Sequence, residues 1–330
     1  MSEITVIMPV YNGELFIEEA IDSILSQTFS NFILLIINDN STDGTQEIIE
    51  RYLKQDNRVK YLKNDINLGA AISRNIAIDL ATTEYIALMD ADDKAVPRRF
   101  EKQLNFLKSH PEIGVCGAGF QFFGDKDRVI KHSEKHDEIK VDFLSHCAIQ
   151  NSTAMLRRLS LGNLRFDENM IVAEDYSLWS QLIAKTKFHN LQEVLVLYRW
   201  HEKNISQTEG GKLEAYEFTV RTRQLERLDI HPDDPNLAHY IFAISLKRNE
   251  TKESIIKTIK AANELKLKNK KYKYFNQEIF EKHVDNTIIR TIRNSKTTDK
   301  EFYRYIKRDS GYFNKMPKLD IVNFFLKSHI

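Results

Sequence analysis

The sequence predicts an α/β protein with a doubly wound, mostly parallel sheet, followed by an α-helical C-terminal region. Through the first 200 residues, short apolar runs alternate with apolar residues at helical spacing, which favours strands joined by helices. One run, residues 32–37, is continuously apolar, as in strands buried on both faces of a parallel sheet. After His201 the pattern changes to long, lysine-rich helical stretches.

Each of the first three predicted strands is followed by a predicted helix. Strands are expected at residues 4–9, 32–37, 59–62 and 85–89, and a later apolar strand at 194–197. Helices are expected at residues 16–25, around 48–53 and at 70–80. In such a sheet, ligands bind beyond the carboxyl ends of the strands, so the residues that follow each strand are the candidate site.

The C-terminal part is predicted to contain several long helices. Helices are expected at residues 212–228, 237–246, 252–267, 277–294 and 319–327. A polar, glycine-containing joint at residues 204–211 separates them from the α/β part. We therefore expect two domains, residues 1–205 and residues 206–330, which suits a chain of 330 residues.

Charge is distributed unevenly along the chain, although the formal net charge is only +1. Residues 247–330 carry 21 Lys and Arg against 10 Asp and Glu, a net charge of +11, and residues 1–246 carry −10. A basic tail of this kind can contact an anionic membrane surface, a nucleic acid or an acidic partner, and of these we predict the membrane surface. The alternative is that its lysines are only the solvated faces of helices. We expect no nucleic acid partner.

Two kinds of protein are excluded by simple features. The longest uninterrupted apolar run, residues 32–37, is far short of the roughly 20 residues of a membrane-spanning helix, and no secretory signal is expected. Two cysteines, Cys116 and Cys147, are too few for a disulfide framework. A cytoplasmic setting is expected, with peripheral attachment to the inner face of the plasma membrane as a further hypothesis.

Polar clusters follow three of the predicted strands: Pro9–Gly13, Asn38–Ser41 and Asp90–Asp93. They should meet at one edge of the sheet. Asp90 and Asp92 stand at i and i+2 directly after an apolar strand, where two carboxylates repel unless a cation or ligand offsets their charge. Oxygen ligands of this kind predict Mg²⁺ or Mn²⁺, with a surface turn as the alternative.

Five segments, taken in order, resemble glycosyltransferase family 2. They are Val6–Asn12, Asn38–Thr45, Asn67–Gly69 with Arg74 and Asn75, Met89–Asp93, and Ala173–Trp179. The resemblance covers roughly residues 3–201 and implies a GT-A fold, which is Rossmann-like, and a nucleotide-diphosphate sugar donor transferred with inversion. Asn40 replaces the glycine usual in the family, and Asn tolerates the positive φ that such a turn needs.

The resemblance implies roles for the nucleotide-binding residues. Pro9, Tyr11 and Asn12 would shape the wall around the nucleoside, unless they form only an ordinary turn. Asp39 would accept the N3 hydrogen of uracil or thymine, which favours a UDP-sugar or dTDP-sugar; its alternative role is local turn formation. Arg74 would approach the phosphates, or would be a surface ion pair.

The resemblance also implies the metal-binding residues. Asp92 is the expected direct ligand, with Asp90 near the ribose or a metal-bound water, and the ion would stabilise charge on the departing diphosphate. His201 would contact the metal or the diphosphate, and a structural histidine is the alternative. Asp93 is expected to cap the following helix, in which Pro97 suits the first turn.

The remaining roles belong to the acceptor side. Asp175, with Glu174 beside it, is implied as the base that takes the proton of the acceptor hydroxyl, and its alternative role is a helix N-cap. Residues 150–153 would line the acceptor pocket, or would form a polar loop.

The predicted function is an inverting glycosyltransferase that adds a single sugar to a saccharide acceptor, either free or lipid-linked. The expected setting is the assembly of a bacterial surface polysaccharide or oligosaccharide. Processive synthases of the family carry Q-x-x-R-W, and Val196 stands here in place of the glutamine. One alternative is a sugar-nucleotide pyrophosphorylase, which the single glycine of residues 9–13 disfavours. Another is a noncatalytic nucleotide- or saccharide-binding module.

Overall fold

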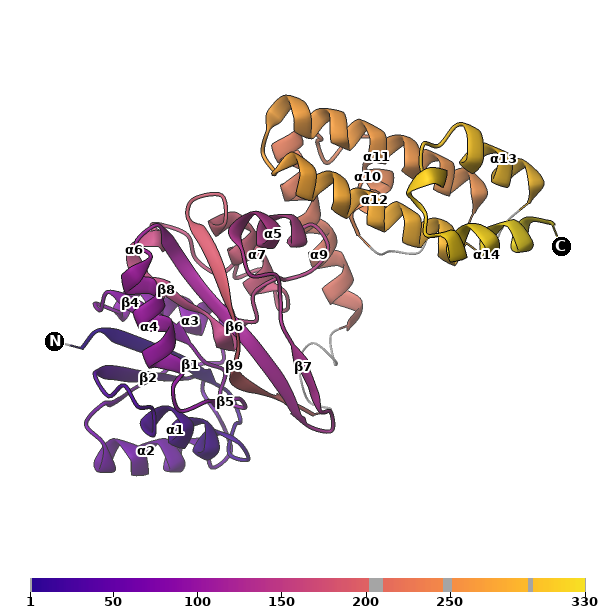
Figure 1. Ribbon diagram of the computed structural model, residues 1–330. Helices are drawn as coiled ribbons and strands as arrows, with labels where there is room; N and C mark the ends of the chain where they lie inside the picture. Colours follow the sequence, from indigo (N-terminus) through magenta and orange to yellow (C-terminus); the bar gives the residue numbers. More distant parts are fainter. Residues whose placement is uncertain (1, 202–209, 246–250, 296–298, 330) are drawn as a thin grey trace. The chain divides into compact units, whose positions relative to one another are not determined.

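The computed structural model describes residues 2–201, 210–245, 251–295 and 299–329 (Figure 1). The chain divides into two compact units. Unit 1 comprises Met1–Ile139 and Cys147–Glu217, and unit 2 comprises Lys140–His146 and Phe218–Ile330. The predicted boundary at residue 205 lies outside the described residues, and the division between the units falls after Glu217.

Unit 1 is built on a mixed sheet whose first four strands are parallel. Within the described residues it has nine strands in the order β3-β2-β1-β4-β8-β6-β9-β5, with β7 paired to β6. The strands are β1 (Ile4–Val10), β2 (Phe32–Asn38), β3 (Val59–Lys63), β4 (Tyr85–Leu88), β5 (Lys94–Ala95), β6 (Ile113–Gly124), β7 (Arg128–Ile130), β8 (Met155–Arg157) and β9 (Lys187–Trp200). The predicted α/β class with a mostly parallel sheet is confirmed.

Helices connect and flank these strands. They are α1 (Ile17–Leu25), α2 (Thr45–Gln55), α3 (Ala70–Leu80), α4 (Arg99–Ser109), α5 (His136–Asp142), α6 (Arg158–Leu161) and α7 (Glu174–Leu182), with a 3-10 turn, η1 (Asn151–Thr153). The apolar spacing predicted for α1 is confirmed, because Ile17, Ala20, Ile21 and Ile24 are its buried side chains. The helix α3 packs on β1 and β2 and carries Arg74 beneath the edge of the sheet.

The strand register brings the polar clusters together. Val10 pairs with Asn38 at the ends of β1 and β2, and Ile7 pairs with Leu88 at the end of β4. The amide of Asp39 donates to the carbonyl of Val10 over 2.8 Å, so the two chains leave the sheet side by side. The prediction that the residues after β1, β2 and β4 meet at one edge is confirmed.

Unit 2 is helical, as predicted. The helix α9 (Gly210–Leu225) begins in unit 1 and ends in unit 2. The elements that follow it are η2 (Glu226–Leu228), α10 (Leu237–Ile244), α11 (Lys252–Tyr272), α12 (Gln277–Asn294), α13 (Lys300–Arg308), η3 (Phe313–Lys315) and α14 (Lys318–His329). Side chains cap three of the helices: Thr251 caps α11, Asn276 caps α12 and Asp299 caps α13. The helix α13 was not expected from the sequence.

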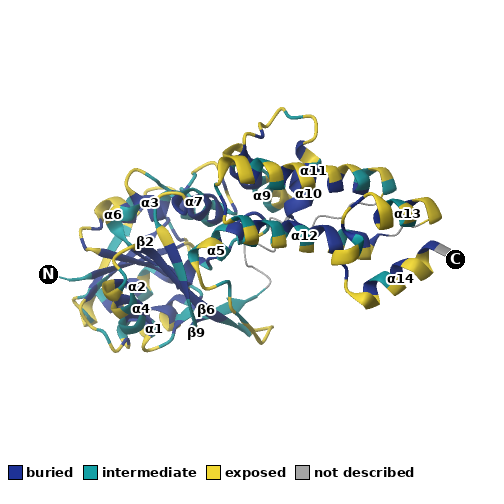
Figure 2. Cartoon of the chain, turned by 45° about the horizontal axis from the view of Figure 1, so that its top comes forward, coloured by how far each residue is buried: buried dark blue, intermediate teal, exposed yellow. Residues whose placement is uncertain are grey.

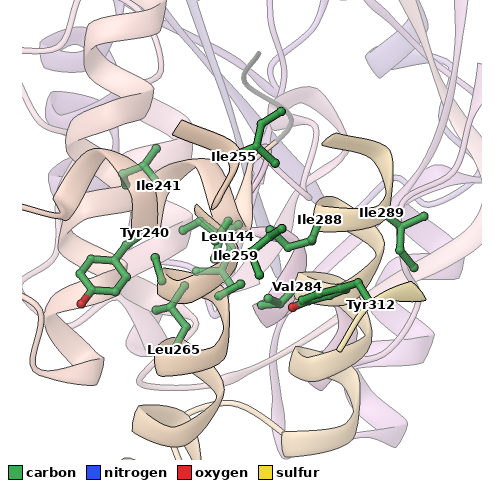
Figure 3. Close-up of a cluster of buried hydrophobic side chains, with 14 of the residues drawn as sticks. Leu144, Tyr240, Ile241, Ile255, Ile259, Leu265, Val284, Ile288, Ile289 and Tyr312 are labelled. Atoms are coloured by element: carbon green, nitrogen blue, oxygen red, sulfur yellow. The ribbon is translucent and has the colours of Figure 1, made fainter. Parts of the chain in front are cut away.

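The core of unit 2 recruits two side chains from far back in the sequence. Val141 and Leu144 are buried in the same cluster as Ile241 of α10, Ile259 of α11 and Ile288 of α12. Figure 3 shows Leu144 among Tyr240, Ile259 and the other labelled side chains of this cluster. Residues 140–146 therefore belong to unit 2, although they interrupt the sequence of unit 1.

Two further observations concern the part of the chain that the structure describes. Among the described helices, none combines the length and the apolar character of a membrane span. Cys116 and Cys147 are both free thiols, which agrees with the prediction that they form no disulfide framework.

Candidate active site

The loops that follow β1 and β2 brace each other. The amide of Asn12 donates to Ser41 Oγ over 2.9 Å, and the amide of Thr42 donates to Asn12 Oδ1 over 2.8 Å. Asn12 and Asn40 both have positive φ, 50° and 61°, so the predicted conformation of Asn40 is confirmed. Pro9 is a buried residue of β1, one position before the end of the strand, and Tyr11 directly after the strand is half exposed.

Asp39 is buried and points toward the segment after β3. Its carboxylate accepts hydrogen bonds from the amides of Leu68, over 2.9 Å, and Gly69, over 2.7 Å, and from Asn64 Nδ2 over 2.7 Å. These donors lie 25 to 30 residues further along the chain, so the alternative of local turn formation is wrong. The carboxylate keeps further acceptor capacity, because an ionised carboxylate offers about four lone-pair sites.

Arg74 joins two parts of the site. Its guanidinium is buried, and it donates to Asp90 Oδ1 over 2.8 Å and to Glu174 Oε1 over 2.6 Å. The alternative of a surface ion pair is therefore wrong. Burial alone lowers the pKa of Arg74, but the charges of Asp90 and Glu174 outweigh burial, and the net shift of its pKa is upward.

Asp90 is held by further donors. Asn151 Nδ2 lies 3.3 Å from its Oδ1, and Ser152 Oγ donates to its Oδ2 over 3.0 Å. The side chains of residues 151–153 are buried in the 3-10 turn η1. Two of these residues orient Asp90, a role that sequence reasoning missed.

Asp92 and His201 lie together at the open side of this network. His201 Nε2 is 3.2 Å from Asp92 Oδ2, and the His201 ring stands with its centroid 5.0 Å from that of Phe16. Burial, and next the negative charge of Asp90, raise the pKa of Asp92. A cation beside Asp92 would offset both effects.

These residues fit a divalent cation bound with its substrate. Asp92 and His201 present a hard oxygen and an imidazole nitrogen next to each other. No cluster of three or more His, Cys, Asp or Glu side chains with metal-binding geometry occurs among the described residues. A site with few protein ligands suits Mg²⁺ or Mn²⁺, which complete their coordination with water and substrate phosphates.

Asp93 does not cap the next helix, which corrects the prediction. The helix α4 begins at Arg99 with Arg98 as its N-cap and no side-chain cap, whereas Asp93 is buried and accepts from the amide of Arg199 over 2.9 Å. Burial, and next the charge of Asp92, raise the pKa of Asp93 well above its usual range. Arg199 also donates through Nε to the carbonyl of Asp92 over 2.9 Å, and so it fastens the turn of residues 90–93 to β9.

Asp175 lies in the first turn of α7, one residue after Glu174. The N-cap of α7 is Ala173, with φ of 63°, so the alternative of an Asp175 N-cap is wrong. Burial, and next the charge of Glu174, raise the pKa of Asp175 to about 7. A carboxyl group that titrates near neutral pH suits a general base.

The site thus contains two pairs of neighbouring acidic residues, and a buried arginine joins one member of each pair. Arg74 pairs with Asp90 on the one hand and with Glu174 on the other. Sequence reasoning predicted that Asp90 and Asp92 lie at the sheet edge, but it could not predict that Arg74 pairs with Glu174, because these two residues are 100 positions apart.

Replacing the buried arginine should destabilise unit 1. Arg74→Met leaves Asp90 and Glu174 with an uncompensated negative charge, which typically costs about 3 kcal/mol of the free energy of unfolding. Denaturant unfolding at pH 8 would measure this loss. The matched control is Arg98→Met, which removes an exposed pair with Glu101 and should cost much less stability than Arg74→Met. Equal losses in the two variants would contradict the assigned role of Arg74.

Comparison with known proteins supports the class that the fold and site define, a glycosyltransferase with the GT-A fold. The model of "Glycosyl transferase family 2" matches residues 5–165. An uncharacterized glycosyltransferase of Methanocaldococcus jannaschii is 33% identical over 228 residues, which cover 66% of this chain and 78% of the relative. The chain belongs to glycosyl transferase family 2.

Two further similarities are to an enzyme from Escherichia coli and to a solved structure. The Escherichia coli enzyme named UDP-Glc:alpha-D-GlcNAc-diphosphoundecaprenol beta-1,3-glucosyltransferase WfaP is 33% identical over 209 residues, 62% of this chain and 80% of that protein. The crystal structure of S. aureus TarS 1-349 in complex with UDP matches with a TM-score of 0.55 at 18% identity, over 88% of this chain and 90% of that one. This structural match supports the GT-A fold.

Proposed function

We propose that the protein is an inverting glycosyltransferase that transfers a single sugar from a UDP-sugar, or from a dTDP-sugar, to a saccharide acceptor in the assembly of a bacterial surface glycan. One observation carries this proposal: the buried Arg74 pairs with both Asp90 and Glu174, the sequence neighbours of Asp92 and Asp175. Such a site has the two groups that inverting transfer needs, one for the leaving diphosphate and one for the acceptor proton.

The nucleotide would bind at the edge formed by the loops after β1 and β2. Asp39 supports a uracil or thymine base, since the carboxylate accepts the N3 hydrogen that cytosine lacks. The name of the E. coli relative includes the donor UDP-Glc, and the structure of TarS is a complex with UDP. A UDP-sugar is therefore the first donor to test.

Asp92 and His201 would hold Mg²⁺ or Mn²⁺ at the diphosphate. When bound, the ion stabilises the negative charge that develops on the leaving diphosphate. Asp90 is held in place by Arg74, Asn151 and Ser152, and this fixed carboxylate would bind the ribose or a water molecule beside the ion. Arg199 keeps the turn of residues 90–93 in position through its bonds to Asp93 and to the carbonyl of Asp92.

Asp175 would act on the opposite side of the donor sugar. As the acceptor hydroxyl attacks the anomeric carbon, Asp175 takes the hydroxyl proton, and the bond from that carbon to the diphosphate oxygen breaks. Attack from the face opposite the leaving group inverts the anomeric configuration. Val196, in place of the glutamine of processive synthases, supports the addition of one sugar only.

A donor screen tests the proposal. The protein is incubated with Mn²⁺, with UDP-, dTDP-, GDP- or CDP-sugars and with a saccharide diphospholipid acceptor, and the products are read by mass spectrometry. We expect transfer or slow donor hydrolysis with UDP- or dTDP-sugars. Transfer from CDP-sugars alone would contradict the role of Asp39, and tight UDP binding without any turnover would indicate a noncatalytic module.

Activity should rise with pH through the titration of Asp175. Its pKa of about 7 means that the base is mostly protonated, and inactive, at pH 6 and mostly ionised at pH 8. The free-enzyme value of kcat/KM should therefore increase about tenfold or more between these pH values. The residual activity of Asp175→Asn should be flat over the same range, and a rise of equal size in this variant would assign the titration to another group.

A further inference from the structure

Buried side chains on one side of the helix α14 anchor it to unit 2. Phe324 is buried and packs edge-on against Phe302 of α13, with ring centroids 5.6 Å apart. Asp320, also buried, pairs with Arg293 of α12. These contacts fix the orientation of the helix within its unit.

The opposite side of α14 is apolar and exposed. Leu319, Val322, Phe325 and Leu326 are between 43% and 71% exposed, and Figure 2 shows exposed positions along this helix. Residues 319, 322 and 326 are spaced by three and four positions, so they form one stripe along the helix. We call Leu319, Val322, Phe325 and Leu326 the α14 stripe. A contiguous apolar stripe on an exposed helix is typical of an interaction surface.

Positive charge surrounds the α14 stripe. Residues 300–329 carry seven Lys and Arg against three Asp and Glu, a net charge of +4, and one of the three acids, Asp320, is already paired with Arg293. Lys318 and Lys327 are exposed on α14 itself, and Lys307 and Arg308 are exposed at the end of α13. An occupant of this surface therefore needs apolar groups together with negative charge.

We propose that α14 docks on an anionic lipid bilayer, with the α14 stripe among the upper acyl chains and the neighbouring lysines at the lipid phosphates. An amphipathic helix with this division of residues lies in the plane of the membrane interface. Each basic residue near an anionic surface strengthens the attachment, and lysine stems can extend to keep the charge at the headgroups. A second copy of the chain is a poorer occupant, because it would bring two surfaces of net charge +4 together.

This inference rests on unit 2 and does not depend on the proposed chemistry. It does have a consequence for that chemistry. The name of the E. coli relative includes a lipid-linked acceptor. If the acceptor of this protein is also lipid-linked, docking confines the enzyme to the surface where its acceptor resides.

Vesicle sedimentation of the full chain tests the proposal. We compare vesicles of phosphatidylcholine with vesicles that also contain phosphatidylglycerol, and expect binding only to the second kind, weakened by salt. The variant Leu319→Gln with Leu326→Gln should lower the partition coefficient at least about tenfold, because two half-inserted leucines are lost. The matched control is Leu267→Gln, which replaces a 69% exposed leucine of α11 and should leave binding unchanged.

Three results would overturn the proposal. The first is equal binding to neutral and anionic vesicles, and the second is wild-type binding by the double variant. The third is a wild-type protein that self-associates but does not bind vesicles, together with a double variant that no longer self-associates. Circular dichroism checks the fold, and Val322→Gln alone replaces the double variant if the latter unfolds. Transfer to a water-soluble acceptor should stay at the wild-type rate in all these variants, which separates a failure of docking from a failure of the proposed function.

Discussion

Asp92→Asn should reduce sugar transfer about 10³-fold and remove the effect of divalent cations on donor binding. Asp92 Oδ2 lies 3.2 Å from His201 Nε2, and burial and the nearby charge of Asp90 raise the pKa of Asp92. Loss of the charge stabilisation that a bound cation supplies is worth several kcal/mol, which is about this factor in rate. Calorimetric titration of UDP with and without Mn²⁺ and steady-state assays would measure the two effects.

The neighbouring carboxyl group supplies a matched control. Asp93 is buried with a strongly raised pKa, and an asparagine at this position can still accept from the amide of Arg199. Asp93→Asn should therefore retain most of the activity and the response to Mn²⁺. Equal losses in the two variants would show that the turn, and not a cation at Asp92, is responsible. Undiminished transfer by the unaltered protein in excess chelator would also contradict the metal site.

Asp175→Asn should lower the rate of transfer by roughly 10²- to 10⁴-fold, the usual contribution of a general base. Asparagine has nearly the same size and can accept the hydrogen bond that the Tyr176 amide now donates to Asp175 Oδ1 over 2.7 Å. It cannot take a proton. Affinity for UDP should change little, because the base acts on the acceptor. Near-normal turnover would remove Asp175 from the mechanism, and Glu174 would be the next residue to test.

The same substitution has an opposite effect on stability. The pKa of Asp175 is raised in the folded protein, so its carboxyl group lowers the free energy of unfolding as the pH rises from about 4, where the unfolded chain loses this proton, to about 7, and no further change follows above that pH. Asparagine does not ionise, and at pH 8 Asp175→Asn should be as stable as the unaltered protein or more stable. Unfolding curves at pH 6 and pH 8 would show this change. Glu174→Gln is the contrast, because it removes the partner of Arg74 and should destabilise unit 1.

The local features of the fold could be predicted from the sequence. The continuous apolar run of β2 and the spacing of Ile17, Ala20 and Ile24 on α1 are signals carried by a few adjacent residues, and both elements form as expected. The positive φ of Asn40 follows from the conformational tolerance of asparagine. The convergence of the polar clusters follows from the parallel order of the strands.

Features that depend on distant pairing could not be predicted in this way. The short helix α13 buries only Phe302 and Ile306, which is too little apolar periodicity to stand out among its charged residues. Arg74 looked like a possible surface residue, because nothing near it in the sequence shows that Asp90 and Glu174 surround it. The same holds for Asp93, whose partner Arg199 lies 106 positions away.

The seven residues Lys140–His146 also bear on how the chain folds as it is synthesised. Val141 and Leu144 leave the ribosome before any part of the helices that bury them, since the rest of unit 2 begins at Phe218. Domains generally fold in the order of their synthesis, so unit 1 can form around a segment whose apolar side chains still lack their partners. A fragment that stops before Phe218 would keep these two side chains exposed to water, and we expect it to aggregate more readily than the full chain.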